Sequence, residues 1–301
     1  MKMTFQKLVI GASMAIGVSA LATPAQAGTL TGATIGGTAA SDYYVYDSDA
    51  KNTFKVENPS ANDVQKVLSG NAVSPTGNVE LRASSEAAGF DFTKNTSLTG
   101  TIGGKTLTLS SLTSDDWFGV GKTTTTYGSS NLANTWFSQV LSSNNITSSV
   151  LGVLGYTKQT LFTTFLTSGG FQRFSDPNIS YVNQDDTSGL ISIGLAGHLD
   201  AKPLLFPGLP SQVSNLFTSP LQASELVKYT YDGKTDYLYS FKATNSGLLE
   251  KSDGISHSGN YEVTIKGVVP PAAVPEPSVI LGLLGVAGVF ATQRKLKKAS
   301  I

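Results

Sequence analysis

The apolar positions of this chain follow two different periods, which separate its middle from the segments on either side. From residue 28 to about residue 127, and again from Ile179 onward, apolar residues alternate with polar ones or form short runs, as in β-strands. Between Asn131 and Gly170 they recur at spacings of three and four, which is the helical period. The pattern predicts a β-rich body with a helical insert near residues 131–170.

One hairpin can be placed from its turn residues. Leu98–Ile102 and Lys105–Leu109 flank Gly103 and Gly104, and two glycines suit a tight turn with positive φ at both positions. A short helix is expected over residues 60–68, where Ser60 serves as the N-cap.

A second hairpin is expected around Asp232-Gly233, between Val227–Tyr231 and Tyr237–Phe241. A strict two-residue turn would place the tyrosines of the first strand on the opposite face from those of the second. Either both faces are covered or the loop is wider, and the wider loop is favoured. The predicted fold is α+β, with an antiparallel, sandwich-like β body and the helical insert.

The composition excludes several classes of functional site. The chain of 301 residues has no cysteine and two histidines, so disulfides, thiolate nucleophiles and cysteine-based zinc sites are excluded. The net charge is zero, but without the two ends the body holds 15 basic and 20 acidic residues and carries about −5. A nucleic-acid-binding protein would show a basic stripe, and none is visible, so no nucleic-acid partner is expected.

The N-terminal segment has the three parts of a secretory signal peptide. Two lysines within the first seven residues precede the apolar stretch Leu8–Leu21, and Ala25 and Ala27 form an A-x-A cleavage site. We expect signal peptidase to remove residues 1–27 on export. A retained signal anchor is the alternative.

The C-terminal segment combines a proline motif, an apolar stretch and a basic end. Residues 267–277 are a proline-rich linker that ends in Pro275, Glu276 and Pro277, and seventeen uncharged residues run from Pro277 to Gln293. As a helix they would measure roughly 25 Å, slightly less than the ~30 Å hydrocarbon core of a bilayer. We expect residues 278–301 to form a transmembrane helix with a basic tail, rather than a buried core helix.

The basic residues Arg294 and Lys295 follow this stretch and favour a cytoplasmic C-terminus, with the body outside the membrane. Together with Pro275, Glu276 and Pro277 they give a tail that resembles the PEP-CTERM sorting signal of exported bacterial proteins. The resemblance covers about 28 of the 301 residues. It implies cleavage near the tail by exosortase, a membrane protease-transpeptidase, so that the membrane is only a transient anchor.

The body, residues 28–266, resembles that of some cyanobacterial PEP-CTERM proteins that carry no assigned activity, and it shows no catalytic motif. His198 lies near Asp200 and His257 lies in a loop of serines and glycines, but no G-x-S-x-G elbow accompanies either. Gly-Lys-Thr begins at residues 104, 121 and 233, and none has the earlier glycine of a phosphate-binding loop. Each triplet is predicted to be a turn, and no cofactor is expected.

Carboxylates suggest two weaker candidates. Asp42, Asp47 and Asp49 could contribute to a calcium loop, but Lys51 stands where an EF-hand needs an oxygen ligand, so no metal is expected. Asp115-Asp116 and Asp185-Asp186 are pairs of adjacent carboxylates, and paired acids can serve a glycosidase. The members of each pair would point to opposite faces of a strand, so neither pair forms such a site by itself.

Exposed aromatic rings can stack on sugars, and the chain has two tryptophans. Trp136 has core spacing on its predicted helix and is expected to be buried. Trp117, beside Asp115 and Asp116, is the better candidate for a polysaccharide platform.

Two functions remain for the body. The first is a non-enzymatic component of the cell surface or extracellular matrix. The second is a secreted carbohydrate-binding or carbohydrate-active protein, with an extracellular polysaccharide as partner. The absence of a catalytic constellation favours the first.

Overall fold

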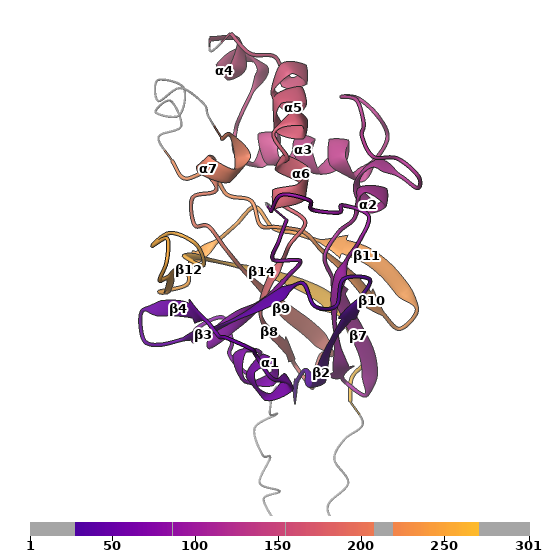
Figure 1. The fold of residues 1–301 in the computed structure, drawn as a ribbon, viewed down its shortest axis with the longest axis vertical. Coiled ribbons are helices and arrows are strands. Elements are labelled where there is room, and N and C mark those ends of the chain that lie inside the picture. The colour runs from indigo at the N-terminus through magenta and orange to yellow at the C-terminus, as the bar shows by residue number, and fades with distance from the viewer. Residues whose placement is uncertain (1–27, 86, 154, 208–218, 271–301) are drawn as a thin grey trace, which may run out of the picture.

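The computed structural model describes residues 28–85, 87–153, 155–207 and 219–270. Two β-sheets form the lower part of the molecule in Figure 1, and the helices α3 to α6 stand over one end of the strands. The expected signal peptide, residues 1–27, and the tail, residues 271–301, lie outside the described residues. Within the described part, no helix has the length and apolar character needed to cross a membrane.

The larger sheet has nine described strands. They run in the order β12-β14-β9-β8-β5-β3-β4-β13, and β1 pairs with β8. All these pairs are antiparallel except β13 with β4. In chain order the strands are β1 (Gly28–Thr29), β3 (Tyr43–Ser48), β4 (Asn52–Lys55), β5 (Gly77–Leu81), β8 (Asn178–Gln184), β9 (Leu190–Gly197), β12 (Thr244–Asn245), β13 (Leu249–Glu250) and β14 (Gly259–Lys266).

The smaller sheet has five described strands in the order β11-β10-β7-β6-β2, all antiparallel. They are β2 (Thr31–Gly37), β6 (Thr96–Ile102), β7 (Lys105–Ser110), β10 (Val227–Tyr231) and β11 (Lys234–Leu238). The helix α1 (Ala61–Val67) contacts strands of both sheets. Ser60 caps α1 through a hydrogen bond from the Asp63 backbone N–H, as the sequence predicted.

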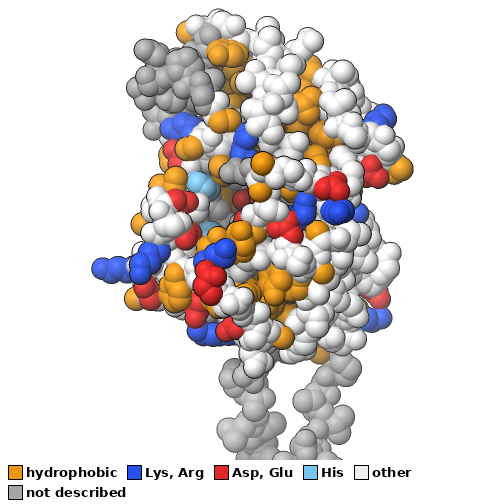
Figure 2. All heavy atoms as spheres, in the orientation of Figure 1, with side chains coloured by type: hydrophobic (Ala, Val, Ile, Leu, Met, Phe, Trp, Pro, Cys, Tyr) orange, Lys and Arg blue, Asp and Glu red, His pale blue; other side chains and the backbone are white. Residues whose placement is uncertain are grey.

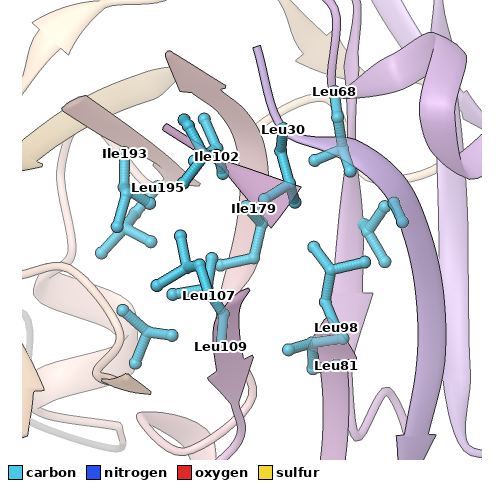
Figure 3. Packing of buried hydrophobic residues seen from close by; sticks show 14 of the residues in the cluster. Leu30, Leu68, Leu81, Leu98, Ile102, Leu107, Leu109, Ile179, Ile193 and Leu195 are labelled. Carbon is cyan, nitrogen blue, oxygen red and sulfur yellow. The ribbon is translucent and has the colours of Figure 1, made fainter. Parts of the chain in front are cut away.

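The two sheets share one hydrophobic core, which we call the β core. Its side chains are mostly aliphatic, and Figure 3 shows them converging between the strands of the two sheets. Examples that are completely buried are Leu98, Leu107, Ile179 and Ile193. Each such side chain stabilises the fold by about 1.5–3 kcal/mol relative to an exposed position.

The helical part, which we call the cap, has its own core. Its helices are α2 (Ser114–Phe118), α3 (Leu132–Ser143), α4 (Ser148–Val153), α5 (Lys158–Thr167), α6 (Gly170–Arg173) and α7 (Lys202–Leu205). Trp117, Trp136, Phe165 and Phe171 form the centre of the cap core and lie in ring-to-ring contact. The β-rich α+β body, the helical insert near residues 131–170 and the burial of Trp136 are therefore confirmed.

The two predicted hairpins differ in outcome. The turn at Gly103-Gly104 has φ values of +57° and +75°, which confirms the expected tight turn. The wider loop expected near Asp232 is wrong, because Tyr231 pairs directly with Lys234 across a two-residue turn. Both faces of this hairpin are covered: Tyr229 packs against the β core and Tyr237 packs against the cap core.

Candidate functional site

A polar cleft of about 340 Å³ lies at the junction of the β body and the cap. Its walls come from segments that are far apart in the sequence: β3, β5, the stretch from α6 into β8, the end of β9, the residue Glu225, and the loop between β13 and β14. Figure 2 shows histidine side chains beside acidic ones in a recess between the helical and the β parts of this face. Both histidines of the chain, His198 and His257, line the cleft.

The loop between β13 and β14 is fixed by its own carboxylates. Glu250 Oε2 accepts hydrogen bonds from the backbone N–H groups of Ser252 and Asp253, at 2.9 and 3.1 Å. Asp253 Oδ1 accepts from the N–H groups of Ile255 and Ser256, at 2.8 and 3.0 Å. These bonds turn the chain so that His257 enters the interior.

His257 is buried and uncharged near neutral pH. Its Nδ1 lies 2.7 Å from Thr53 Oγ1, and its ring packs edge-on against Tyr46, with the ring centres 4.7 Å apart. Burial lowers the pKa of His257 to about 4, a shift that Asp253 opposes and His198 reinforces. The residue also has a φ of +62°, a backbone conformation that residues other than glycine seldom adopt.

A histidine, a serine and an aspartate meet at the rim of the cleft, but not in the order of a hydrolytic triad. His198 Nε2 lies 3.2 Å from Ser256 Oγ, and Ser256 Oγ donates to Asp253 Oδ2. In a triad the histidine stands between the serine and the acid and removes the proton of the serine. Here the proton of the serine is held by the carboxylate.

Asp253 is also a weak base. Partial burial acts to raise its pKa, but the hydrogen bonds from Ile255 and Ser256 outweigh burial and lower it. The group therefore offers little driving force for removing a proton from Ser256.

A second group of carboxyls lies deeper in the cleft. Asp176, in the segment between α6 and β8, is 7 % exposed, and its Oδ2 accepts a hydrogen bond from Ser85 Oγ. Burial raises the pKa of Asp176 well above its usual value, and the neighbouring charges of Glu225 and Glu80 raise it further. Asn178 connects to this group through a 3.1 Å bond from its Nδ2 to Glu225 Oε2.

Two atoms in this deeper part have no hydrogen-bond partner: Asp176 Oδ1 and Asn178 Oδ1. Both residues line the cleft, and both side chains are more than nine-tenths buried. A buried acceptor without a donor costs about 1–3 kcal/mol. The raised pKa of Asp176 favours its protonated form, and Oδ1 is the oxygen left to carry that proton, because Oδ2 accepts from Ser85 Oγ.

The predicted aromatic platform is wrong. Trp117 is completely buried, because residues 114–118 form the helix α2, which directs the indole into the cap core. Its ring nitrogen donates to Ser175 Oγ at 2.7 Å. The capping box of α2, in which Thr113 and Asp116 bond reciprocally, is the signal in the sequence that could have indicated the helix.

The two aspartates beside Trp117 also lie away from the cleft. Asp115 Oδ1 accepts from the Gly121 N–H at 3.0 Å. Asp116 Oδ1 accepts from Lys228 Nζ and from the hydroxyl of Tyr237, both at 2.8 Å. Burial acts to raise the pKa of Asp116, but these bonds and those from Thr113 lower it overall. Asp116 therefore joins α2 to the smaller sheet.

The aspartates considered for calcium do not converge. Asp42 pairs with Arg82 at 2.6 Å, Asp47 pairs with Lys66, and Asp49 caps its own turn. In the described ranges no three histidine, aspartate or glutamate side chains are placed to hold a metal ion together.

The other sequence candidates are turns. Gly104 and Gly233 lie in the two hairpin turns, as expected for Gly-Lys-Thr triplets without a phosphate-binding glycine. Asp185 Oδ1 caps a turn by accepting from the N–H groups of Thr187 and Ser188. The motif residues Pro275, Glu276, Pro277, Arg294 and Lys295 and the cleavage residues Ala25 and Ala27 lie outside the described residues.

Comparison with known proteins gives no further assignment, because no protein-family model, no curated protein and no solved structure matches this chain.

Proposed function

We propose that this chain is an exported protein of the cell surface or extracellular matrix. In this proposal signal peptidase removes residues 1–27, residues 28–266 form a sandwich-like body, and the linker 267–277 leads to a transmembrane helix with a basic tail, residues 278–301. Exosortase then cleaves near Pro275, Glu276 and Pro277, so that the membrane anchor is transient.

One structural observation supports this arrangement: both ends of the described body lie at the same pole. Gly28 pairs with Gln184 in the larger sheet, and Gln184 Nε2 donates to the carbonyl oxygen of Val268 at 2.7 Å. Figure 1 shows this pole at the end opposite the helices α3 to α6. A body anchored through either end would therefore hold its cap and cleft away from the membrane.

The geometry of the cleft supports a body that does not catalyse a reaction. The serine nearest a histidine, Ser256, has its proton bonded to Asp253, and His257 is held by Thr53 in a buried position. Neither arrangement provides an activated nucleophile with its base.

Substitution of one motif residue tests the proposal. Glu276→Ala should leave export intact but keep the tail attached, so that the protein without its signal peptide stays in the membrane fraction. Intact-mass analysis of the wild-type protein from cells with an active exosortase should show the loss of roughly residues 278–301. Retention of Arg294 to Ile301 in that protein would refute the processing step.

The second candidate is a carbohydrate-binding protein, and the observation that favours it is the cleft of about 340 Å³ with its lining of polar and carboxyl side chains. A cleft of this size is within the range of ~300–1,000 Å³ that is usual for small ligands. Binding of oligosaccharides to the purified protein, lost when Asp176 is changed but not when Asp115 is changed, would support this candidate.

A further inference from the structure

The strand β14 is paired on its outer side over only its first two residues. The short strand β12 pairs there with Gly259 and Asn260. β14 continues to Lys266, and in the described part of the chain no further strand lies along its outer side. Residues 262–266 are therefore an open edge of the larger sheet, where backbone groups can pair with another strand.

The hydrogen bonds at its two ends identify which backbone groups of β14 point outward. In an antiparallel pair the residues alternate between those bonded to one neighbouring strand and those directed away from it. The N–H of Ser246, next to β12, donates to the carbonyl of Ser258, and the N–H of Gly267 donates to Gly189 on the β9 side. The register between β14 and β9 has no bulge, so the alternation is continuous. The outward backbone groups are those of Glu262, Thr264 and Lys266.

The other described sheet edges are protected. On β11, the N–H of Tyr237 is bonded to the neighbouring carboxylate of Asp236 at 2.8 Å. On β2, the N–H of Ala33 bonds to Gln65 of α1 at 3.3 Å, and the register with β6 shifts once along the strand. β13 is only two residues long. Short strands, bulges and covering side chains are the usual devices against unwanted pairing. In the described chain, residues 262–266 have no such cover.

The exposed side chains of this stretch are complementary to themselves. Glu262, Thr264 and Lys266 are exposed and share one face of β14. A second copy of β14, paired antiparallel about Thr264, places Glu262 of each copy opposite Lys266 of the other. Each outward residue then exchanges two backbone hydrogen bonds with the residue opposite it, and cross-strand pairs of opposite charge add stability.

Shifted registers fit less well. Pairing centred on Glu262 or on Lys266 brings like charges face to face, which is destabilising. The intermediate registers would use the outward groups of Asn260, which β12 already pairs, or those of Val268. Val268 has left the strand, because its carbonyl oxygen accepts from Gln184 Nε2 at 2.7 Å. The register about Thr264 therefore matches the length of the open edge as well as its charges.

We propose that the outer edge of β14 binds a second copy of this chain, in antiparallel register about a two-fold axis at Thr264. The larger sheets of the two copies then form one continuous sheet. A two-fold contact of this kind uses the same surface on both copies, so the assembly closes as a dimer and does not grow into a fibre. Because one short edge buries little surface, we expect a dissociation constant on the order of micromolar.

A cysteine at the two-fold axis tests the register. The chain has no cysteine, so Thr264→Cys introduces a single thiol. Opposed Cα atoms in a hydrogen-bonded pair lie about 5.5 Å apart, which is within disulfide reach. After mild oxidation of the purified full chain in detergent, a non-reducing gel should show a covalent dimer as the main species. Thr230→Cys is the control, because Thr230 is equally exposed but lies on β10 between two paired strands.

Exchange of the charges tests the identity of the partner. Sedimentation of the full chain in detergent measures the dimerisation constant. Glu262→Lys and Lys266→Glu each oppose like charges in both pairs, so each variant alone should dimerise at least tenfold more weakly than the wild type. An equimolar mixture of the two variants opposes unlike charges again and should recover the wild-type affinity. Such recovery also shows that both variants are folded.

Four results would overturn the proposal. They are a wild-type chain that stays monomeric up to ~0.1 mM, equal cross-linking at positions 264 and 230, dimerisation unchanged in both charge variants, and a mixture that associates no better than each variant alone. Dimerisation unchanged in the variants would place the contact elsewhere in the chain. None of these results bears on the processing of the tail, which the Glu276→Ala experiment measures separately.

Discussion

The β core and the cap core are built from different side chains. The β core consists mainly of Leu, Ile and Val from paired strands, with Tyr231 and Tyr261 as its buried aromatics. The cap core adds nine buried tryptophan and phenylalanine side chains to its aliphatic ones, most of them from helices of 4 to 12 residues. Aliphatic, branched residues fit a pleated surface whose backbone is already hydrogen-bonded to its neighbours.

Short helices lack that external support, because isolated helices below about 12–15 residues are marginal in water. The cap therefore depends on the packing of large rings, each of which buries about 150–250 Å². The comparison suggests that the cap should loosen before the sheets do.

The largest expected effect comes from removing a ring at the centre of the cap. Phe171 contacts Trp117 and Phe165, each with ring centres 4.9 Å apart, and Phe171→Ala should cost about 3–5 kcal/mol. Both tryptophans of the chain lie in the cap core, so tryptophan fluorescence reports the cap, whereas the β-sheet component of the amide I infrared band reports the strands.

In a denaturant titration of Phe171→Ala, the fluorescence midpoint should fall further than the midpoint of the β-sheet infrared signal. The wild-type protein is the reference for both signals. Equal shifts would show that the two cores unfold as one cooperative unit, and the distinction drawn between them would fail.

The corresponding change in the β core is Leu107→Ala. Leu107 is completely buried on β7, opposite Tyr231 of β10, and its truncation should cost about 2–5 kcal/mol. Because β10 carries the hairpin whose Tyr237 packs on the cap, both midpoints should move together. A shift in the infrared signal alone would mean that the cap stays folded without the smaller sheet.

The same comparison explains what could be predicted from the sequence. The hairpin at Gly103-Gly104 and the cap of α1 at Ser60 depend on neighbouring residues, and both were predicted correctly. The turn at Asp232-Gly233 has equally clear local chemistry. The wider loop predicted there is wrong, because the alternation of the tyrosines does not show that the cap covers the outer face of the hairpin.

The interior of the cap and the cleft could not be predicted from local patterns. Trp117 next to two aspartates looks exposed until α2 is recognised, and its contact with Phe171 joins residues 54 positions apart. The acceptor residues Asp176 and Asn178 meet Glu80 and Glu225 only after β5 pairs with β8 and the chain returns to the junction. The sequence contains one hint of the cleft, because each of its two histidines lies near a carboxylate or a serine.

Acid should weaken the junction between the two regions. The pKa of His257 is about 4 in the folded protein, below its ordinary value of 6.5, so the unfolded chain binds more protons between these values. The stability that neutral His257 provides is complete above pH 6.5 and is lost as the pH falls to about 4. The loss amounts to about 3 kcal/mol.

Asp176 acts in the opposite direction, since its raised pKa makes protonation favourable to folding as the pH falls. The pH dependence should therefore be measured in His257→Asn, which tolerates a positive φ and can accept from Thr53. Unfolding free energies from pH 4 to 7 should fall less steeply with acid in this variant than in the wild type. Identical slopes would contradict the assignment to His257.

The smallest expected effects come from removing the N-cap hydroxyl of two capping boxes, one in each region. Ser60 and Asp63 cap α1 on the β body, where Ser60 is exposed, so Ser60→Ala should cost about 1 kcal/mol. Thr113 caps α2 through Asp116, which Lys228 and Tyr237 also hold in a partly buried position. Thr113→Ala removes one donor from that network and should cost about 1–2 kcal/mol.

Ser60→Thr and Thr113→Ser keep the hydroxyl groups, so these control variants should change the free energy of unfolding by close to zero. If urea titrations show Thr113→Ala to be the milder change, Asp116 does not join the cap to the sheet, and the junction depends on the packing of Tyr237 alone.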